Sequence, residues 1–390
     1  MPRVQAAVAA AIRAARGDPA RPQQVSRRLG LDKTLAWKLV RVTTEIDAMT
    51  AAERLPGRSG LKIFADALTK AAIPQTLFAD LLAALADFER VVADHAGGDR
   101  ERFTKLLAAR SPEGRRKVDE AQRKLAFQGL STTWGVRARL QFTTSLIAPN
   151  RADPDRFDFA SFTGLCDFVR DRSEISWVVA SPRATNDDGS LSRMSGAERI
   201  DATVTEGPPI IADLCTPNLP SLRVRSAAQG VVKYELPDSV GGELGPMSIV
   251  TGGVIRAPVS RWWSPDNRVA SFLCTLGTPA ELLVFDLLVH RDSWPEHTPG
   301  MYCYSQLPTA PVYPTDGFDK GLIPILESPA EIAEGDEKEM PGVAGYSGAL
   351  DRAAAAMGWT IRDFRMARFQ LRYPPVPSLV SYRYDLSPKS

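Results

Sequence analysis

Along roughly the first 130 residues, apolar side chains recur every three or four positions, which is the spacing of an amphipathic helix. The clearest stretch begins after Pro74 and is closed by His95 and the glycines at 97 and 98. Shorter patterns predict helices over 4–16 and 112–130. The long stripe suits either a buried core or the interface of a homodimer, because the spacing is the same in both. Its members are Phe78, Leu81, Leu82, Leu85, Phe88, Val91 and Val92.

From about residue 131 the period changes to two. Leu140, Phe142, Thr144 and Leu146 alternate with more polar residues, which predicts a half-buried strand. Similar runs, separated by loops rich in proline and glycine, predict further strands over 175–180, 222–236, 269–276, 282–290, 366–373 and 381–386. The clearest helical pattern among them covers 347–359.

These patterns predict an α+β protein of three regions. Residues 1–58 form a helical head, and residues 59–130 form a helical connector or dimerisation region. Residues 131–390 form a mainly antiparallel, β-rich domain with flanking helices, because few helical patterns separate its strands. A chain of 390 residues with 44% hydrophobic content can bury more than one core.

Within the head, residues 22–41 have the spacing of two short helices joined by a sharp turn. Ser26 lies four residues before Gly30, where a helix crossing leaves little room, and Gly30 can take the positive φ that ends the first helix. Asp32 is a natural N-cap, so the second helix begins near Lys33. The predicted buried positions are Val25, Leu29, Leu31, Ala36 and Leu39.

This segment, with the helix predicted over 4–16, resembles the helix-turn-helix regulators of bacteria, and the resemblance covers about residues 4–41. It implies that the second helix enters the major groove of double-stranded DNA. By position, it assigns base reading to Lys33, Thr34 and Lys38. The other residues that it places at the interface are Trp37 on the same face and three arginines that suit phosphates, Arg27, Arg28 and Arg41.

Two positions depart from the family pattern. Leu35 stands where a Ser or Thr is usual, and Trp37 is bulky for a side chain in a groove. The second helix could therefore be rotated, or could contact another protein through Trp37. In the plainest alternative, the three helices of the head are only a packing module.

Charge is distributed unevenly along the chain. Residues 1–41 hold nine Lys or Arg against two acids, and residues 1–150 hold 25 against 15. Residues 151–390 hold 23 against 31, so the net charge of +2 conceals a basic first part and an acidic second part. A protein that neutralises phosphates needs such a local excess of positive charge.

These features together predict a sequence-specific DNA-binding protein, and more narrowly a transcriptional regulator whose small-molecule effector is unknown. Reading a palindrome requires a homodimer. The main alternative is a structural or protein-interaction protein that uses the three-helix head as a docking module. The mixed-charge helix over 112–130 is either solvated or a second DNA-contacting surface.

A third alternative is an enzyme with its site in the β-rich domain. Asp286 and His290 lie four residues apart on a predicted strand and so share a face, and a carboxylate beside an imidazole is the minimum for general-base chemistry. No nucleophile elbow or phosphate loop accompanies them, and a histidine with a local hydrogen bond at a strand end explains His290 more simply. The glycine-rich stretches 241–245 and 251–253 are predicted to be turns.

No catalytic residue, metal or cofactor is therefore predicted. The four cysteines are at least 29 residues apart and lack the paired spacing of a zinc or redox site, so reduced, partly buried thiols are expected. No apolar run approaches the roughly 20 residues that span a bilayer. The alanine-rich start is interrupted by Arg13 and Arg16, unlike a signal peptide, so a cytoplasmic protein without membrane contact is expected.

Overall fold

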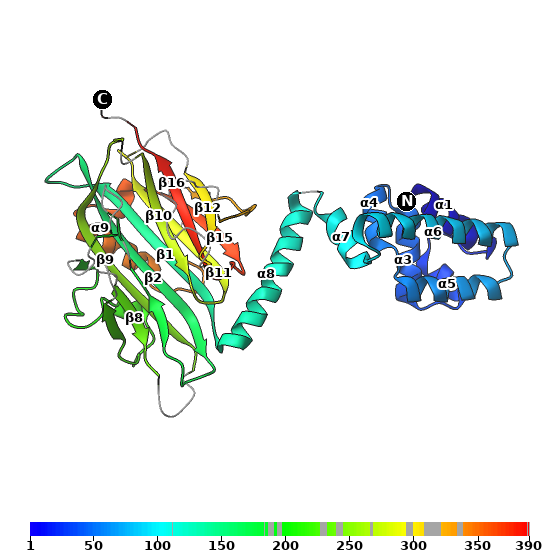
Figure 1. Ribbon diagram of the computed structural model, residues 1–390, viewed down its shortest axis with the longest axis horizontal. Coiled ribbons are helices and arrows are strands. Elements are labelled where there is room, and N and C mark those ends of the chain that lie inside the picture. The colour runs from blue at the N-terminus through cyan, green and yellow to red at the C-terminus, as the bar shows by residue number, and fades with distance from the viewer. Residues whose placement is uncertain are drawn as a thin grey trace. The chain divides into compact units, whose positions relative to one another are not determined.

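The computed structural model divides into two compact units, Met1–Asp119 and Glu120–Ser390. It describes all residues except 111, 183, 186–190, 193–196, 227–231, 239–244, 266–267, 294–298, 308–320, 334–337, 388 and 390. Helices dominate the first unit and strands the second (Figure 1), so the predicted α+β class with a helical first part is confirmed at this level. In the part of the chain that is described, no helix is long and apolar enough to cross a membrane.

The first unit consists of helices joined by short turns. Helix α6 (Gln75–Ala96) ends where Gly97 adopts a φ of 64°, as the sequence predicts. A further helix, α8 (Pro112–Trp134), begins in the first unit and ends in the second. The predicted helices over 4–16, after Pro74 and over 112–130 are confirmed. The helices are α1 (Pro2–Ala14), α2 (Pro22–Leu29), α3 (Lys33–Thr44), α4 (Ala48–Arg54), α5 (Arg58–Lys70), α6 (Gln75–Ala96) and α7 (Arg100–Ala108).

A single buried cluster extends through the first unit from Val4 to Phe103. The cluster includes residues on both sides of residue 58. The predicted boundary between the head (1–58) and the connector (59–130) stays a prediction. The long apolar stripe of α6 is split between two environments. Leu81 and Val92 belong to the core, whereas Leu82 is 47% exposed and Val91 is 43% exposed. The stripe therefore serves mainly the core of this unit.

The second unit is built on a seven-stranded sheet in the order β14-β15-β11-β1-β2-β9-β6. Figure 1 shows the long strands β1, β2 and β9 side by side. Neighbouring strands are antiparallel except β1 and β11, which pair in parallel from Ala138 with Ala280 to Ile147 with Val289. The strands are β14 (Ala330–Ile332), β15 (Phe364–Arg372), β11 (Ala280–His290), β1 (Val136–Pro149), β2 (Arg156–Arg170), β9 (Met247–Ser260) and β6 (Glu198–Arg199).

Smaller antiparallel sheets complete this unit. One has four strands in the order β10 (Val269–Leu276), β16 (Ser378–Asp385), β12 (Gly300–Ser305) and β13 (Leu322–Ile323). Another has three, β3 (Trp177–Ala180), β8 (Val232–Leu236) and β7 (Arg223–Ser226), and a short pair joins β4 (Ala184–Thr185) to β5 (Leu191–Ser192). The predicted strands are all present, but the run over 222–236 is two strands, β7 and β8, with residues 227–231 outside the described part.

Helix α9 (Tyr346–Ala356) covers one face of the seven-stranded sheet, where Phe142, Leu288 and Tyr346 share a core. On the other face, Phe285 of β11 packs with Tyr382 of the four-stranded sheet. Strand β1 lies in the middle of this arrangement and is buried on both faces. The prediction that it is half-buried is therefore wrong, because a second layer covers its polar side as well.

The predicted turn at 251–253 is also wrong, since these residues lie inside strand β9. A Cβ atom on Gly252 would lie 2.4 Å from the Cβ of Phe162, and one on Gly253 would lie 3.1 Å from the carbonyl oxygen of Glu198. The two glycines let neighbouring chain segments approach the strand closely, and their role is not to reverse the chain. Residues 241–244 of the other predicted turn lie outside the described residues.

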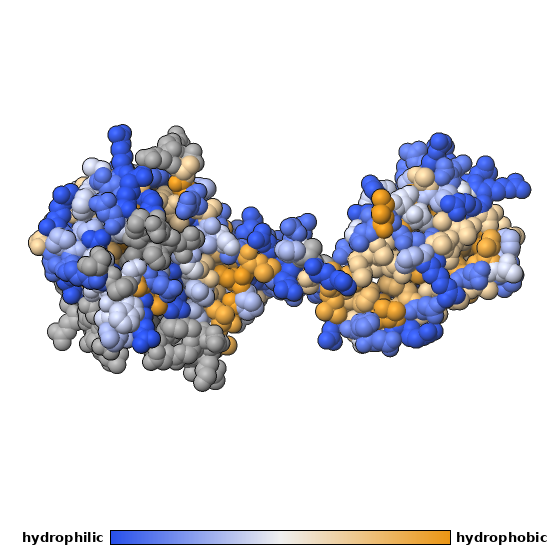
Figure 2. Space-filling view, turned by 90° about the horizontal axis from the view of Figure 1, so that it is seen from above, coloured by the Kyte–Doolittle hydropathy of each residue, from blue (hydrophilic) through white to orange (hydrophobic). Residues whose placement is uncertain are grey.

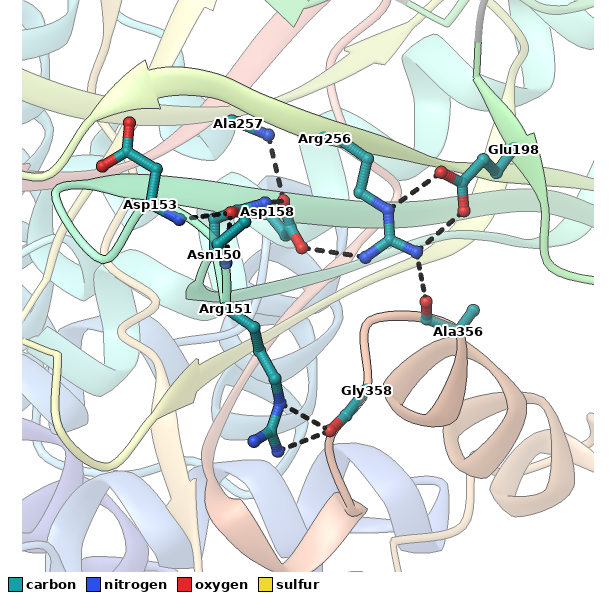
Figure 3. A network of polar contacts seen from close by, with 10 residues as sticks. Asn150, Arg151, Asp153, Asp158, Glu198, Arg256, Ala257, Ala356 and Gly358 are labelled. Carbon is teal, nitrogen blue, oxygen red and sulfur yellow. Dashed lines mark hydrogen bonds and ion pairs between the residues drawn. The ribbon is translucent and has the colours of Figure 1, made fainter.

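Two arginines hold the C-terminal end of α9 against the sheet (Figure 3). Arg256 donates to the carbonyl oxygen of Ala356 at 2.5 Å, and Arg151 donates twice to that of Gly358, at 2.6 and 3.0 Å. Arg256 also pairs with Glu198 and with Asp158, whose carboxylate is buried. Cations at a helix C-terminus are favourable because the free carbonyl groups carry partial negative charge. These hydrogen bonds and ion pairs therefore fix the position of α9.

Candidate nucleic-acid interface

The turn between α2 and α3 is built from three residues with distinct tasks. Gly30 adopts a φ of 62° and ends α2. The backbone N–H of Leu31 donates to the carbonyl oxygen of Ser26 at 3.0 Å, and the Ser26 hydroxyl donates to the carbonyl oxygen of Leu31 at 2.7 Å. Ser26 thus contributes two hydrogen bonds to the turn, a role that its small size alone did not indicate.

Asp32 caps the N-terminus of α3. Its carboxylate accepts from the backbone N–H of Thr34 at 2.7 Å, and this bond holds the pKa of the carboxyl below its usual value. Helix α3 begins at Lys33, as predicted. The five residues predicted to be buried behind the turn are all buried, namely Val25, Leu29, Leu31, Ala36 and Leu39.

Leu35, which departs from the family pattern, packs into the same core as these residues. A Cβ atom on Gly60, near the start of α5, would lie 3.3 Å from Cδ1 of Leu35, so the two helices approach closely at this point. The leucine therefore has a packing role between α3 and α5. A serine or threonine there would remove apolar contact from this junction.

The opposite side of α3 faces solvent. Lys33, Thr34, Trp37, Lys38 and Arg41 are all exposed, and their spacing places them along one side of the helix. The Trp37 side chain is 47% exposed, and the guanidinium carbon of Arg41 lies 5.3 Å from the centroid of its ring. The two arginines at the end of α2, Arg27 and Arg28, are exposed as well.

The cations of α2 and α3 differ from Arg54 and Arg100 of the first unit in having no acidic partner among the described residues. Arg54 pairs with Glu45, and Arg100 pairs with Glu89 at 3.1 Å. Within the residues that the structure describes, no ion pair involves Arg27, Arg28, Lys33, Lys38 or Arg41. Positive charge is thus uncompensated on this segment, which is the condition for attracting a phosphate backbone.

Asp286, the carboxylate of the enzyme alternative, is fully buried on β11 and surrounded by donors. Arg368 donates to both of its oxygens, at 2.8 and 2.7 Å, and the hydroxyl of Tyr346 donates at 2.6 Å. Thr144 lies 2.8 Å from the Tyr346 hydroxyl and extends the network. The carboxylate is therefore the acceptor of a buried ion pair and is occupied on both oxygens.

His290 lies on the same face of β11 as Asp286, but the two side chains are not in contact. Four residues of strand correspond to about 13 Å. The His290 ring lies against Trp359, with centroids 4.1 Å apart, and its Nδ1 accepts from the backbone N–H of Asp292 at 3.3 Å. Burial lowers the pKa of His290, which favours the neutral ring. The arrangement is that of a local hydrogen bond at a strand end, and Asp286 and His290 do not form an acid–base pair.

Burial disfavours the thiolate form of the four cysteines. Cys166, Cys274 and Cys303 are buried, Cys215 is partly buried, and all four are free. Burial raises the pKa of Cys166 and Cys303 to about 11 and that of Cys274 to about 12. Among the described residues, no group of three or more His, Cys, Asp or Glu side chains could hold a metal ion.

The basic stretch of α8 is partly engaged within the second unit. Arg123 donates to Glu327 at 2.6 Å and to the carbonyl oxygen of Arg372 at 3.1 Å, and its side chain is 14% exposed. Lys124 lies over the ring of Tyr373. These two side chains connect the end of α8 to the strands of the second unit. The two roles predicted for the helix, a solvated face or a second DNA surface, stay predictions.

No protein-family model matches the chain, and no curated protein matches it.

Proposed function

We propose that the first unit binds double-stranded DNA through the exposed side of α3, and that the chain is a transcriptional regulator of the helix-turn-helix type. The observation that carries the proposal is a set of cations on two helices joined by a tight, capped turn, none of which has an acidic partner in the described part of the chain. Such a turn holds the second helix in the orientation that lets its N-terminal residues reach base edges.

The proposal gives the exposed residues different tasks. Lys33, Thr34 and Lys38, in the first turns of α3, reach base edges in the major groove. Arg27 and Arg28 at the end of α2 contact phosphates, as does Arg41. The ring of Trp37 positions the Arg41 guanidinium by stacking on it. Base contacts supply sequence preference, whereas phosphate contacts supply most of the affinity.

The charge of the whole unit agrees with this assignment. Residues 1–119 hold 21 Lys or Arg against 14 Asp or Glu, whereas residues 120–390 hold 27 against 32. The paired acids Glu45, at the end of α3, and Asp87 and Glu89 of α6 have arginine partners outside α2 and α3, so they do not compensate the cations of these two helices. Electrostatic steering would bring DNA to the first unit before any base is read.

The test is fluorescence anisotropy of a labelled random duplex titrated with the full chain at several salt concentrations. The Lys33→Glu/Lys38→Glu variant should lose at least ~100-fold in affinity, because it replaces two cations on the DNA-facing side of α3 with carboxylates. Its plot of log K against log salt should also be less steep than that of the wild type, because the variant displaces fewer counterions. The matched control is Lys62→Glu/Lys70→Glu, which makes the same charge change at exposed positions on α5. The control should lose far less.

Two outcomes would contradict the proposal. If the wild-type chain fails to bind at low salt, α3 is not a DNA-reading helix. If the α3 and α5 variants lose affinity equally, binding follows net charge alone and has no defined face. Circular dichroism of both variants should match the wild type, since all four lysines are exposed and none forms a side-chain hydrogen bond or ion pair among the described residues.

A protein-docking function is the second candidate, and the surface of the same unit supports it. Figure 2 shows apolar patches on the helical unit. Trp37 is 47% exposed, and Ile46, just after α3, is 99% exposed. Exposed aromatic and aliphatic side chains of this kind are typical anchors in protein interfaces. This candidate predicts a wild-type chain without DNA affinity and a partner protein that is lost on Trp37→Ala.

A further inference from the structure

The second unit contains a cavity of about 490 Å³ on the side of the seven-stranded sheet that faces away from α9. Its lining comes from β1, β2 and β9 below and from β10 beside it, and the three-stranded sheet contributes Val179, Val224 and Tyr234. Strand β10 is the edge of the four-stranded sheet, so that sheet does not continue over β2 and β9. The cavity occupies the space between β10 and the smaller sheet.

The floor of this cavity is polar although it lies inside the unit. Thr143 of β1 pairs in register with Thr163 of β2, which in turn pairs with Thr251 of β9. The hydroxyl oxygens of Thr143 and Thr163 are 3.1 Å apart, and that of Thr143 also donates to the sulfur of Cys274 at 3.2 Å. Sheet faces that pack on a second sheet are normally apolar. A row of three threonines indicates that this part of the face serves another purpose.

Gln141 places a buried hydrogen-bond acceptor in the cavity. Its side chain lines the cavity, is 7% exposed, and donates through Nε2 to the carbonyl oxygen of Thr275 on β10 at 2.9 Å. Its Oε1 atom is buried and has no hydrogen-bond partner among the described residues. A buried acceptor without a donor is costly, and such groups in folded proteins call for a ligand or water that satisfies them.

The walls and the charge of the cavity restrict what could fill it. Phe159 and Phe272 stack with their ring centroids 6.1 Å apart, and Val259 and Ile147 add further apolar surface. No carboxylate occurs among the described lining residues. The single guanidinium of the lining, Arg199, donates from its two terminal nitrogens to the carbonyl oxygens of residues 208 and 207, at 3.1 and 2.5 Å. A charged ligand would find no free counter-charge there.

We propose that this cavity is a binding site for an uncharged, mainly apolar small molecule that carries one hydroxyl or N–H group. The group donates to Oε1 of Gln141, the hydroxyls of the threonine row surround it, and the hydrocarbon part lies against Phe159 and Phe272. The volume lies within the range of small-molecule pockets, which combine apolar walls with a few placed polar groups. Ser271 and Val224 belong to the lining and are exposed, so the ligand enters beside β10.

Two probes that differ by one hydrogen-bond donor test the proposal. 2-Naphthol is uncharged at neutral pH and carries a hydroxyl, whereas 2-methoxynaphthalene has the same rings without a donor. Titration of the full chain followed by naphthalene fluorescence should give saturable binding of one molecule of 2-naphthol. The methyl ether should bind about tenfold more weakly, because it leaves the Gln141 oxygen unpaired. This comparison needs no variant, so it stands even if a substitution disturbs folding.

Variants then locate the site. Gln141→Leu should weaken 2-naphthol about tenfold and change the affinity for 2-methoxynaphthalene less than twofold. The matched control is Gln370→Leu on β15, an exposed position outside the cavity lining, which should change neither. Ser161→Phe, which places a ring in the cavity, should abolish binding of both probes while leaving the far-UV circular dichroism unchanged.

Equal affinities of the wild-type chain for the two probes would overturn the assignment of the donor to Gln141. Absence of saturable binding would overturn the site itself, and so would binding that survives Ser161→Phe in a folded chain. None of these results depends on DNA binding by the first unit.

Discussion

The two units of this protein differ in where an amphipathic element places its polar side. In α3 the polar side is exposed, and Lys33 and Lys38 have no acidic partner in the described part of the chain. In β1 the polar side is buried, and Gln141 and Thr143 line a cavity between sheets. Both elements alternate apolar and polar residues in the sequence. The difference shows that such a pattern identifies the two faces of an element but does not say whether a second layer will cover the polar one.

The buried charges of the second unit provide the strongest test of this comparison. Arg368→Met should lower the free energy of unfolding by about 3–5 kcal/mol, because it leaves the Asp286 carboxylate uncompensated inside the core. Urea denaturation followed by circular dichroism measures the change. The control is Arg137→Met, which breaks an exposed pair with Asp171 and should cost less than ~1 kcal/mol. Equal losses in the two variants would mean that burial of the pair is not what matters.

In the first unit, the turn between α2 and α3 offers a contrasting test, because its stability depends on backbone conformation and not on a buried charge. Gly30→Ala should lower the stability of the first unit by about 1 kcal/mol, since a left-handed φ is unfavourable for alanine even where space is open. Gly129→Ala, in the interior of α8 and also in open space, should instead stabilise its helix by about 0.5–1 kcal/mol. Thermal melts of the two variants should therefore shift in opposite directions.

The smallest expected effect is a dependence on pH. Burial lowers the pKa of His290 from its usual 6.5, so the unfolded chain binds a proton more readily than the folded one. Stability is unaffected above that value and decreases as the pH falls from about 6.5 toward the lower folded-state pKa. His290→Gln should remove this part of the decrease between pH 7 and pH 5.

What could be predicted from the sequence was mostly local. The capped turn of the first unit depends on Gly30 and Asp32 and on apolar positions within a few residues of them, so the bounds of α3 and its exposed side followed directly. The strands of the second unit were located because their period of two is also local. The packing role of Leu35 was harder to predict, because the side chain contacts the chain near Gly60 in another helix.

The cavity and the buried ion pair could not be predicted for the same reason. Thr163 of β2 and Cys274 of β10 meet Thr143 only through strand pairing and sheet packing, and nothing near Thr143 in the sequence indicates either neighbour. Arg368 reaches Asp286 from 82 residues away. A carboxylate on a strand is compatible with catalysis or with an ion pair until the adjacent strand is known. The glycines of β9 likewise suggested a turn because the neighbouring segments that require them were unknown.

The parallel pairing of β1 with β11 also has a consequence for synthesis. One edge of β1 can pair with β2 soon after synthesis, but Ala138 pairs with Ala280 on the other edge, so that edge has its neighbour only after 142 further residues have been made. At about 5–20 residues per second, that interval lasts roughly 7–30 s. The helices of the first unit complete their core within residue 103 and can fold before the ribosome has reached β2. During the following interval, the nascent strand exposes an unpaired edge and an apolar face, which makes this segment a natural substrate for chaperones that bind extended chains.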